Sequence, residues 1–231
     1  MRRMISRMLW LVFMCAPLAQ AQDSDPWEAT NRQVQSFNDR VDAAVLKPIA
    51  QGYRAVTPGW TRAGIGNVFS NLGEVSNFAN ALLQGKPDRA ATALGRFVFN
   101  STLGLYGWFD VMDGFGLSEQ PEDFGQTLAV WGVPSGPYVV LPLLGPATVR
   151  DGATRLTADR YLDPLQTLNP AGDRDKVQIL SVVDTRESFL DVEGLILGDR
   201  YTALRNAYLD RRAFLVDDGQ AAGADDFLDD F

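Results

Sequence analysis

The chain has 231 residues, one cysteine, no histidine and a formal net charge of −8. This composition excludes histidine-based catalytic triads and zinc sites built from cysteine and histidine. The excess of acidic residues argues against nucleic acid as a partner, because nucleic-acid binding relies on basic side chains that neutralise phosphates.

The first 21 residues have the pattern of a secretory signal. Arg2, Arg3 and Arg7 precede an apolar run that ends at Leu18, and Ala19-Gln20-Ala21 follows as a cleavage site. The alternative is an anchor left in place, although the run is shorter than the roughly 20 residues that span a bilayer. Cleavage would leave one domain-sized chain of 210 residues with a net charge of −11, because the leader carries three arginines and no acid.

The single cysteine lies inside this apolar run. A lipid-attachment cysteine of a bacterial lipoprotein has small residues just upstream, whereas Phe13 and Met14 are bulky. This context argues against lipidation of Cys15. Cleavage after Ala21 would remove it and leave a mature chain without disulfides or thiol chemistry.

A first helix is predicted to begin at Asp25, which suits a cap, with Pro26 in the first turn. Apolar residues then recur at three- and four-residue spacing and form one stripe. The stripe consists of Val34, Phe37, Val41 and Val45. We expect it to pack on the protein core, which is the usual role of such a stripe, and contact with lipid is the alternative.

Helical spacing continues from Trp60 to Phe99. Gly85-Lys86-Pro87 is predicted to end one helix and open the next, which runs to about Leu103. Glycines then alternate with aromatic residues over residues 104–116. This run follows a helix and not a strand, so the structural context of a nucleotide-binding loop is missing.

The central stretch, residues 123–151, poses the main structural question. It contains no charged side chain between Phe124 and Val149, yet seven glycines and prolines interrupt it from Gly132 to Pro146. It is too apolar for a solvated loop and too broken for a helix. Irregular apolar backbone has to lie buried against protein or line a cavity at membrane depth, where its own amides are satisfied.

Further helices are predicted after this stretch, which makes the predicted fold all-α. Thr148 is the expected cap of a helix through Tyr161, and two more helical patterns follow over residues 177–190 and 201–214. We expect one helical domain over residues 22–216. Residues 217–231 are acidic and rich in alanine and glycine, so we expect a disordered, solvated tail, with a docking motif for a periplasmic partner as the alternative.

The candidates for acid–base chemistry are Glu119, Glu122 and Asp123, since paired carboxylates in different environments can act as acid and base. Their position before a predicted helix is explained more simply by the helix dipole. The sequence also has no Asp/Asn-rich loop of the calcium-binding type. We therefore expect no metal or cofactor, and catalysis is unsupported by the residues.

An ordered set of short motifs resembles the MlaA family, also called VacJ, from about Asp25 to Phe214. The motifs are Asp25-Pro26-Trp27-Glu28, Asn31-Arg32, Phe37-Asn38, Arg96-Phe97, Asn100, Gly104, Asp110-Val111, Asp123-Phe124-Gly125-Gln126-Thr127-Leu128, Gly136-Pro137-Tyr138, Leu141-Pro142 and Arg150-Asp151. The resemblance implies a ring-like helical protein embedded in the inner leaflet of the Gram-negative outer membrane. A central amphipathic channel would let a headgroup cross while acyl chains stay out of water.

The resemblance also implies a function and its partners. Family members take mislocalised phospholipids from the outer leaflet and pass them to a soluble periplasmic carrier, and they associate with outer-membrane porins. They are typically lipoproteins with an N-terminal cysteine, and this chain departs from that pattern. The competing hypotheses are a periplasmic lipid-binding module without membrane insertion and a hydrolase that acts on lipid.

On this resemblance, the central stretch supplies the channel wall or gate, and part of the first helix borders the channel mouth. The predicted wall residues are Leu128, Trp131, Tyr138, Val139, Val140, Leu141, Leu143 and Leu144. The predicted mouth residues are Phe37 and Asn38. The alternative for the wall residues is ordinary core of the ring, because apolar side chains mostly lie in cores.

Overall fold

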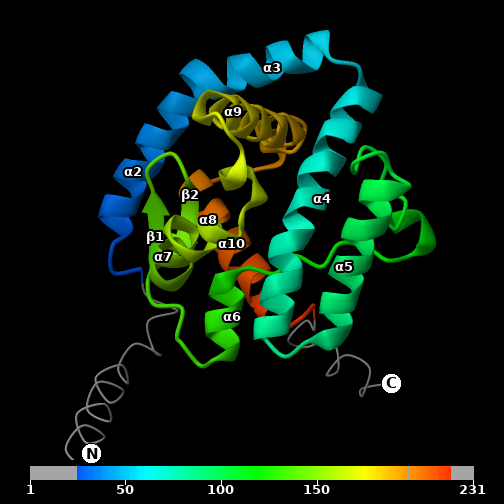
Figure 1. The fold of residues 1–231 in the computed structure, drawn as a ribbon. Helices are drawn as coiled ribbons and strands as arrows, with labels where there is room; N and C mark the ends of the chain where they lie inside the picture. The colour runs from blue at the N-terminus through cyan, green and yellow to red at the C-terminus, as the bar shows by residue number, and fades with distance from the viewer. Residues whose placement is uncertain (1–24, 197, 220–231) are drawn as a thin grey trace, which may run out of the picture.

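The structure, a computed structural model, describes residues 25–196 and 198–219, so the predicted leader, Cys15 and residues 220–231 of the predicted tail lie outside the described residues. The described chain is mainly helical (Figure 1), which confirms the predicted class. Its α-helices are α2 (Glu28–Val41), α3 (Lys47–Val56), α4 (Gly59–Leu83), α5 (Pro87–Thr102), α6 (Phe124–Val130), α7 (Val149–Leu156), α8 (Ala158–Leu162), α9 (Ala171–Ser188) and α10 (Arg200–Val216).

Shorter elements join these helices. They are the π-helical segment η2 (Asp42–Leu46), the 3-10 turns η3 (Asp113–Phe115), η4 (Pro164–Thr167) and η5 (Glu193–Leu195), and the strands β1 (Tyr138–Leu141) and β2 (Gly145–Thr148). The π-helical segment directly precedes Pro48, which has no N–H to donate to the turn before it. Pro48 therefore does not end the helix: the turn before it is widened, and the chain stays helical from α2 into α3.

The first helix begins at Glu28, three residues later than predicted. The Asp25 carboxylate accepts from the Trp27 N–H at 3.3 Å and from the Asn31 side chain at 3.1 Å. Asp25 thus holds the segment that leads into the helix and does not cap it. By contrast, the predicted boundary at Gly85-Lys86-Pro87 is confirmed, because α4 ends at Leu83 and α5 begins at Pro87.

The central stretch contains a short helix and a hairpin. Its residues Phe124–Val130 form α6, capped by the Asp123 carboxylate, which accepts from the Gln126 N–H at 2.8 Å. The prediction that the stretch is too broken for a helix was wrong here, because residues 124–130 contain a single glycine, Gly125, and no proline. Strands β1 and β2 then pair in antiparallel fashion, with Tyr138 opposite Thr148 and Leu141 opposite Gly145.

The helix predicted from Thr148 to Tyr161 is divided in two. The Thr148 hydroxyl accepts from the Asp151 N–H at 3.2 Å, which confirms Thr148 as the cap of α7. That helix ends at Leu156, and α8 begins at Ala158 after Thr157 has left the helical conformation. The change of direction brings Asp159 and Asp163 toward α4, where they line a cavity with it.

The interior is unusually polar, and large apolar side chains lie outside. The buried residues of α2 are Asn31 and Gln35, whereas Phe37 and Val45 are about half exposed. The expectation that the apolar stripe packs on the core is confirmed for Val34, which packs against the buried cluster of Tyr138, Val140 and Tyr201, and was wrong for Phe37 and Val45. The buried positions of α4 are likewise small or polar: Gly64, Asn71, Glu74, Asn77, Asn80 and Ala81.

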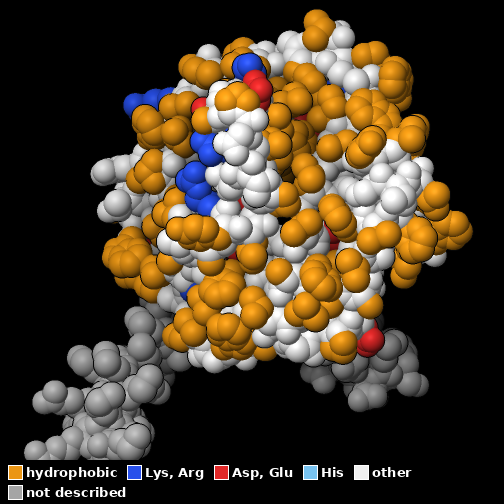
Figure 2. Space-filling model, viewed as in Figure 1, with side chains coloured by type: hydrophobic (Ala, Val, Ile, Leu, Met, Phe, Trp, Pro, Cys, Tyr) orange, Lys and Arg blue, Asp and Glu red, His pale blue; other side chains and the backbone are white. Residues whose placement is uncertain are grey.

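In space, the helices form an arc with one helix inside it. Helices α2 and α3 follow one edge, α4 leads away from the end of α3, and α5 runs back beside α4, while α9 lies within the arc (Figure 1). Figure 2 shows hydrophobic side chains spread over much of one face, with few charged side chains among them. Across the described residues, no helix combines the length and hydropathy that crossing a membrane requires.

Candidate functional site

A cavity of about 300 Å³ lies between α4, α8, η4 and α9, and we call it the α4–α9 cavity. Its lining residues are Phe69, Leu72, Gly73, Ser76, Asp159, Asp163, Pro164, Leu165 and Ser181. Three separate parts of the chain therefore build it. Because α9 contacts both α3 and α4 inside the arc, the cavity lies within the helical framework.

The lining of this cavity has an apolar part and a polar part. Phe69 and Leu72 on α4 provide apolar surface, which η4 extends with Pro164 and Leu165. The polar part consists of hydroxyl and carboxylate groups: Ser76, Ser181, Asp159 and Asp163. A cavity lined in this way suits a ligand that is itself amphipathic, since apolar surface avoids water and polar groups need hydrogen-bond partners.

Backbone N–H groups hold the two carboxylates in place. Asp159 accepts from the Phe124 N–H at 2.9 Å, where α6 begins. Asp163 accepts from the Leu165 N–H at 2.9 Å and from the Gln166 side chain at 3.1 Å, which caps η4. Burial raises the pKa of the Asp159 carboxyl, and the Phe124 N–H only partly offsets that effect.

A polar seam along α4 joins this helix to α5 and to the segment that leads into α6. The seam consists of Asn71, Glu74, Asn77, Asn80 and Gln84, which follow one another at three- and four-residue spacing. Glu74 forms a buried ion pair with Arg96 of α5, and Arg96 also donates to Asp110 at 2.8 Å. Arg96 therefore neutralises both Glu74 and Asp110, and the two carboxylates neutralise Arg96. Without these pairs, burial would make the charges costly.

The same seam holds the segment that leads into α6. The Asn77 side chain accepts from the Glu122 N–H at 2.9 Å, and Asn80 accepts from the Thr127 hydroxyl at 2.9 Å. Gln84 donates to the Glu122 carboxylate at 2.8 Å. Hydrogen bonds of side-chain amides thus hold α4 against this segment, as apolar packing would in a typical core. Each of these bonds is directional.

A second charged cluster joins the central stretch to the last helix. Arg212 of α10 donates to both oxygens of Asp123, at 2.5 and 2.7 Å, and to Asp151 at 2.8 Å. Arg150 donates to Asp151 at 2.9 Å. Burial opposes ionisation of Asp151, but the charges of Arg212 and Arg150 outweigh it and hold the pKa of this carboxyl below its ordinary value.

Close backbone approach explains Gly125 in this cluster. A Cβ at this position would lie 2.4 Å from the Arg212 guanidinium and 2.5 Å from the Asp151 carboxylate. Only glycine fits there. The motifs Asp123-Phe124-Gly125 and Arg150-Asp151 are therefore parts of one ion cluster, a relationship that sequence spacing alone does not reveal.

A third charged cluster positions α9 inside the arc. Glu187 accepts from Arg54 of α3 and from Arg62 of α4, each at 2.5 Å. Asp184 accepts from the Tyr53 hydroxyl at 2.8 Å. The helix that carries Ser181 into the α4–α9 cavity is thus fastened to both neighbouring helices.

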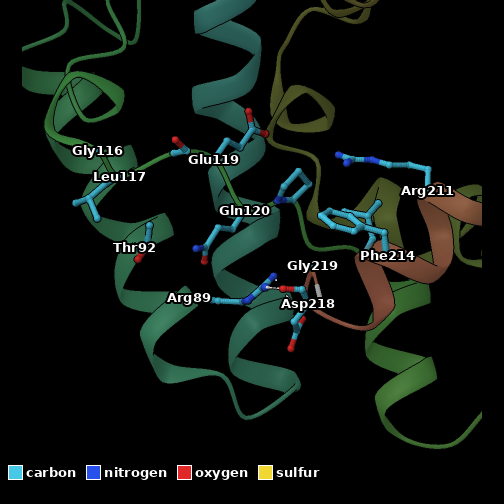
Figure 3. Close-up of a pocket in the computed structure, with 13 residues that line it drawn as sticks. Arg89, Thr92, Gly116, Leu117, Glu119, Gln120, Arg211, Phe214, Asp218 and Gly219 are labelled. Carbon is cyan, nitrogen blue, oxygen red and sulfur yellow. Dashed lines mark hydrogen bonds and ion pairs between the residues drawn. The ribbon is translucent and has the colours of Figure 1, made fainter. Parts of the chain in front are cut away.

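Figure 3 shows another cavity, of about 400 Å³, between α5, the segment before α6 and the end of α10. Arg89 and Asp218 face each other in it, and Arg89 donates to the Asp218 carbonyl at 2.9 Å (Figure 3). Arg89 also donates to Glu122 at 2.8 Å. Arg89 and Asp218 therefore neutralise each other across this cavity. The α4–α9 cavity is the better candidate, because its carboxylates lack such charged partners.

The predicted wall residues do not share one surface. Tyr138 and Val140 lie in a buried cluster with Tyr201, and the structure leaves Trp131, Leu143 and Leu144 about half exposed or more. The others are half-buried: Leu128, Val139 and Leu141. None of the wall residues is among the nine that line the α4–α9 cavity. Their contact with lipid stays a prediction.

The predicted mouth residues have different surroundings. Phe37 is half exposed and lines a shallow hollow on α2 with Arg32 and Arg40. The Asn38 side chain donates to the Leu141 carbonyl at 3.0 Å and accepts from the Leu143 N–H at 2.8 Å. Asn38 therefore holds the hairpin turn, and its contact with a channel also stays a prediction.

The carboxylates considered for acid–base chemistry point to separate partners. Glu119 contacts the Ser70 hydroxyl, Glu122 pairs with Arg89, and Asp123 pairs with Arg212. Within residues 25–196 and 198–219, no group of three Asp, Glu, His or Cys side chains has the arrangement of a metal site. This arrangement lends no support to a role for the three acids as one catalytic centre.

The polar interior, the apolar exterior and the two-sided cavity define a class of helical protein whose outer surface suits a lipid environment. The family model described as MlaA lipoprotein matches residues 23–215, and the chain belongs to this family. The family places the chain in the bacterial cell envelope. The relatives named below are transport lipoproteins or uncharacterized proteins, and none is named as an enzyme.

Individual relatives cover most of the chain. It is 34% identical to the intermembrane phospholipid transport system lipoprotein MlaA of Escherichia coli K12, over 85% of this chain and 80% of that protein. It is 30% identical to the protein of the same description from Haemophilus influenzae, over 91% and 86%. An uncharacterized protein of Rickettsia felis is 33% identical over 79% and 74%.

A solved structure agrees with these relatives. It was reported as the structural basis for maintenance of bacterial outer membrane lipid asymmetry and shares 35% sequence identity with this chain. The two superpose with a TM-score of 0.72, over 84% of this chain and 99% of that one. The agreement covers most of the chain.

Proposed function

We propose that this chain removes mislocalised phospholipids from the outer leaflet of the outer membrane and passes them toward the periplasm. The observation that carries the proposal is the α4–α9 cavity, which offers apolar and polar surface side by side within one helical framework. The names of the Escherichia coli and Haemophilus influenzae relatives, which refer to intermembrane phospholipid transport, support it.

The cavity suits the two chemical halves of a phospholipid. Phe69 and Leu72 would border the acyl chains, while hydroxyls and carboxylates on the other side would border the headgroup. A headgroup that leaves water without hydrogen-bond partners faces a cost of several kcal/mol for each polar group. The polar part of the lining reduces this cost, and no covalent bond has to break.

The apolar exterior supports a position in the membrane. Leu94, Val98 and Phe99 on α5 are about half exposed, and Leu105 and Tyr106 just beyond it are more exposed still. We propose that such residues lie against acyl chains, with the chain held in the inner leaflet as a ring around the lipid path. Trp131, Leu143 and Leu144 remain our candidates for lipid contact near that path.

Two protein partners belong to the proposal. An outer-membrane porin would hold the chain beside the membrane surface, and a soluble periplasmic carrier would receive the lipid. Both rest on the family to which the chain belongs. If Cys15 carries no lipid, retention has to come from the apolar exterior and from these contacts.

The test begins with deletion of the gene and measurement of outer-leaflet phospholipid on intact cells. We expect deletion to raise surface phospholipid and the native chain to restore it. Unchanged surface phospholipid would overturn the proposal. Fractionation separates the alternative of a periplasmic lipid-binding module, which would leave the chain in the soluble fraction, and turnover of phospholipid by pure protein would instead indicate a hydrolase.

A further inference from the structure

Buried carboxylates elsewhere in the chain have cationic partners. This is expected, because an unpaired charge in the protein interior costs several kcal/mol. The pairs are Glu74 with Arg96, Glu122 with Arg89, Asp151 with Arg212, and Glu187 with Arg54. Neutralisation by lysine or arginine is therefore the rule in this interior.

Asp159 and Asp163 in the α4–α9 cavity are half-buried, and they lack such partners. Their hydrogen-bond donors are the neutral N–H groups of Phe124, Leu165 and Gln166, and in the described part of the chain neither forms an ion pair. None of the nine residues that line the cavity is cationic. The cavity thus presents negative charge that no basic side chain in its lining neutralises.

A ligand with a positive charge would supply the missing neutralisation. We propose that the α4–α9 cavity selects a zwitterionic phospholipid with a primary ammonium in its headgroup over an anionic phospholipid. The inference rests on the proposed function, since it assigns the headgroup class to the same cavity. Ammonium–carboxylate hydrogen bonds are charge-assisted and roughly twice as strong as neutral ones, so they favour this headgroup over others.

The hydroxyls of the cavity fit the rest of such a headgroup. Ser76 accepts from the Asn80 side chain at 3.2 Å, so its own O–H remains available to donate. Together with Ser181 it offers donors for phosphate oxygens, while Asp159 and Asp163 offer acceptors for the ammonium. An anionic headgroup such as glycerol phosphate brings only negative charge, which the two carboxylates repel.

The test compares three phospholipids with identical acyl chains: phosphatidylethanolamine, phosphatidylcholine and phosphatidylglycerol. Each is offered to the purified full chain in detergent, and bound lipid is counted by native mass spectrometry. We expect the native chain to prefer phosphatidylethanolamine over phosphatidylglycerol by roughly tenfold, the ratio that one charge-assisted hydrogen bond provides. Phosphatidylcholine should fall between them, because its quaternary ammonium donates no N–H bond.

The variant Asp159→Asn tests the assigned residue. Its amide oxygen still accepts from the Phe124 N–H, so the fold is preserved while the charge is lost. We expect the preference to fall several-fold, and Ser181→Lys to reverse it toward phosphatidylglycerol. The matched control Asp175→Asn removes an exposed carboxylate on α9 and should keep the native preference.

The possible failures are distinguishable. Binding of both lipids with equal strength, unchanged in Asp159→Asn, would overturn the inference and leave the proposed function in place. Absence of any bound phospholipid would overturn the proposed function itself. A preference that Asp175→Asn abolishes as strongly as Asp159→Asn would show that surface charge, and not the cavity, selects the headgroup.

Discussion

Asn31 and Asn38 stand seven residues apart on the same side of α2, and each side-chain amide pairs with the backbone edge of β1 and its turn. Asn31 donates to the Tyr138 carbonyl at 3.1 Å and accepts from the Val140 N–H at 2.9 Å. Asn38 makes the matching pair of bonds with Leu141 and Leu143. The two asparagine side chains of α2 therefore bond to the backbone edge of β1 as a neighbouring strand would.

This relationship predicts the effect of removing one amide. Asn31→Ala leaves a buried carbonyl and a buried N–H without partners, which costs about 1–3 kcal/mol for each such group. We expect a lower unfolding free energy and faster hydrogen exchange at the Val140 N–H. Asn38→Ala should be milder, because its surroundings are more exposed, and an equal loss of stability in both variants would contradict this account.

Polar side chains lie inside this protein and large apolar side chains lie outside. We therefore expect different effects on stability from substitutions at the two kinds of position. Asn77→Leu removes the acceptor for the buried Glu122 N–H, so we expect a loss of about 1–3 kcal/mol of unfolding free energy. The double variant Leu94→Gln/Val98→Gln alters exposed positions of α5 and should change stability in detergent by less than about 0.5 kcal/mol for each residue.

The second half of this prediction concerns the membrane. We expect Leu94→Gln/Val98→Gln to lower the fraction of the chain that sediments with membranes, because apolar surface next to lipid is lost. Asn77→Leu serves as the control, since its exterior is unchanged. If membrane retention depends on Asn77 but not on Leu94 and Val98, the assignment of the α5 surface to lipid contact and of Asn77 to the interior is contradicted.

Gly64 and Trp108 make a close contact between α4 and the segment after α5. A Cβ at Gly64 would lie 2.2 Å from the indole ring, so Gly64→Ala forces one of them to move. We expect a loss of about 1–3 kcal/mol in chemical unfolding. Gly52→Ala, where nothing lies within 4 Å, should instead gain about 0.5–1 kcal/mol because alanine favours the helix.

The ion cluster around Arg212 predicts a pH dependence. The pKa of Asp151 lies below its ordinary value in the folded chain, so its contribution to stability is present above about pH 4 and is lost as the pH falls through the folded pKa. Arg212→Met should cost about 3–5 kcal/mol at neutral pH, because Asp123 loses its cationic partner and the buried Asp151 keeps only Arg150.

Unfolding measured between pH 7 and pH 3 checks both parts. The native chain should lose stability below about pH 4, and Arg212→Met should lose less over the same range, since the pKa of Asp151 is then less depressed. Arg211→Met is the matched control, because its exposed guanidinium lies over the Phe214 ring and outside the cluster. A control that behaves like Arg212→Met would refute the role of the cluster.

The sequence predicts helix boundaries better than it predicts which side of a helix faces inward. Gly85 and Pro87 act locally, through backbone conformation and a missing N–H, so their effect is readable in the sequence. An apolar stripe such as the one containing Phe37 shows only that one face of the helix is apolar and the other polar. Whether the polar face lies inside depends on the surrounding medium, which spacing does not encode.

The sequence of α4 also contains a sign of its buried polar side. Glu74 is the only charged residue between Arg62 and Lys86, and asparagines stand three residues away from it on both sides. An isolated acid in such an apolar helix indicates a buried polar partner. The α4–α9 cavity was beyond reach, because it joins residues near 70, 160 and 181 whose proximity arises only from tertiary packing.

The central claim is that phospholipid passes through the α4–α9 cavity, and Gly73 offers the most direct test. It lines the cavity, and nothing lies within 4 Å of the position where its Cβ would be. Gly73→Trp should therefore fill the cavity with little strain, while Gly52→Trp on α3, with equally open surroundings, places the same side chain elsewhere.

Both variants are expressed in a deletion strain, their membrane levels are matched, and outer-leaflet phospholipid is measured on intact cells. We expect Gly52→Trp to restore the low surface phospholipid of the native strain, whereas Gly73→Trp should leave it as high as deletion does. Full restoration by Gly73→Trp would contradict the claim that this cavity is the lipid path.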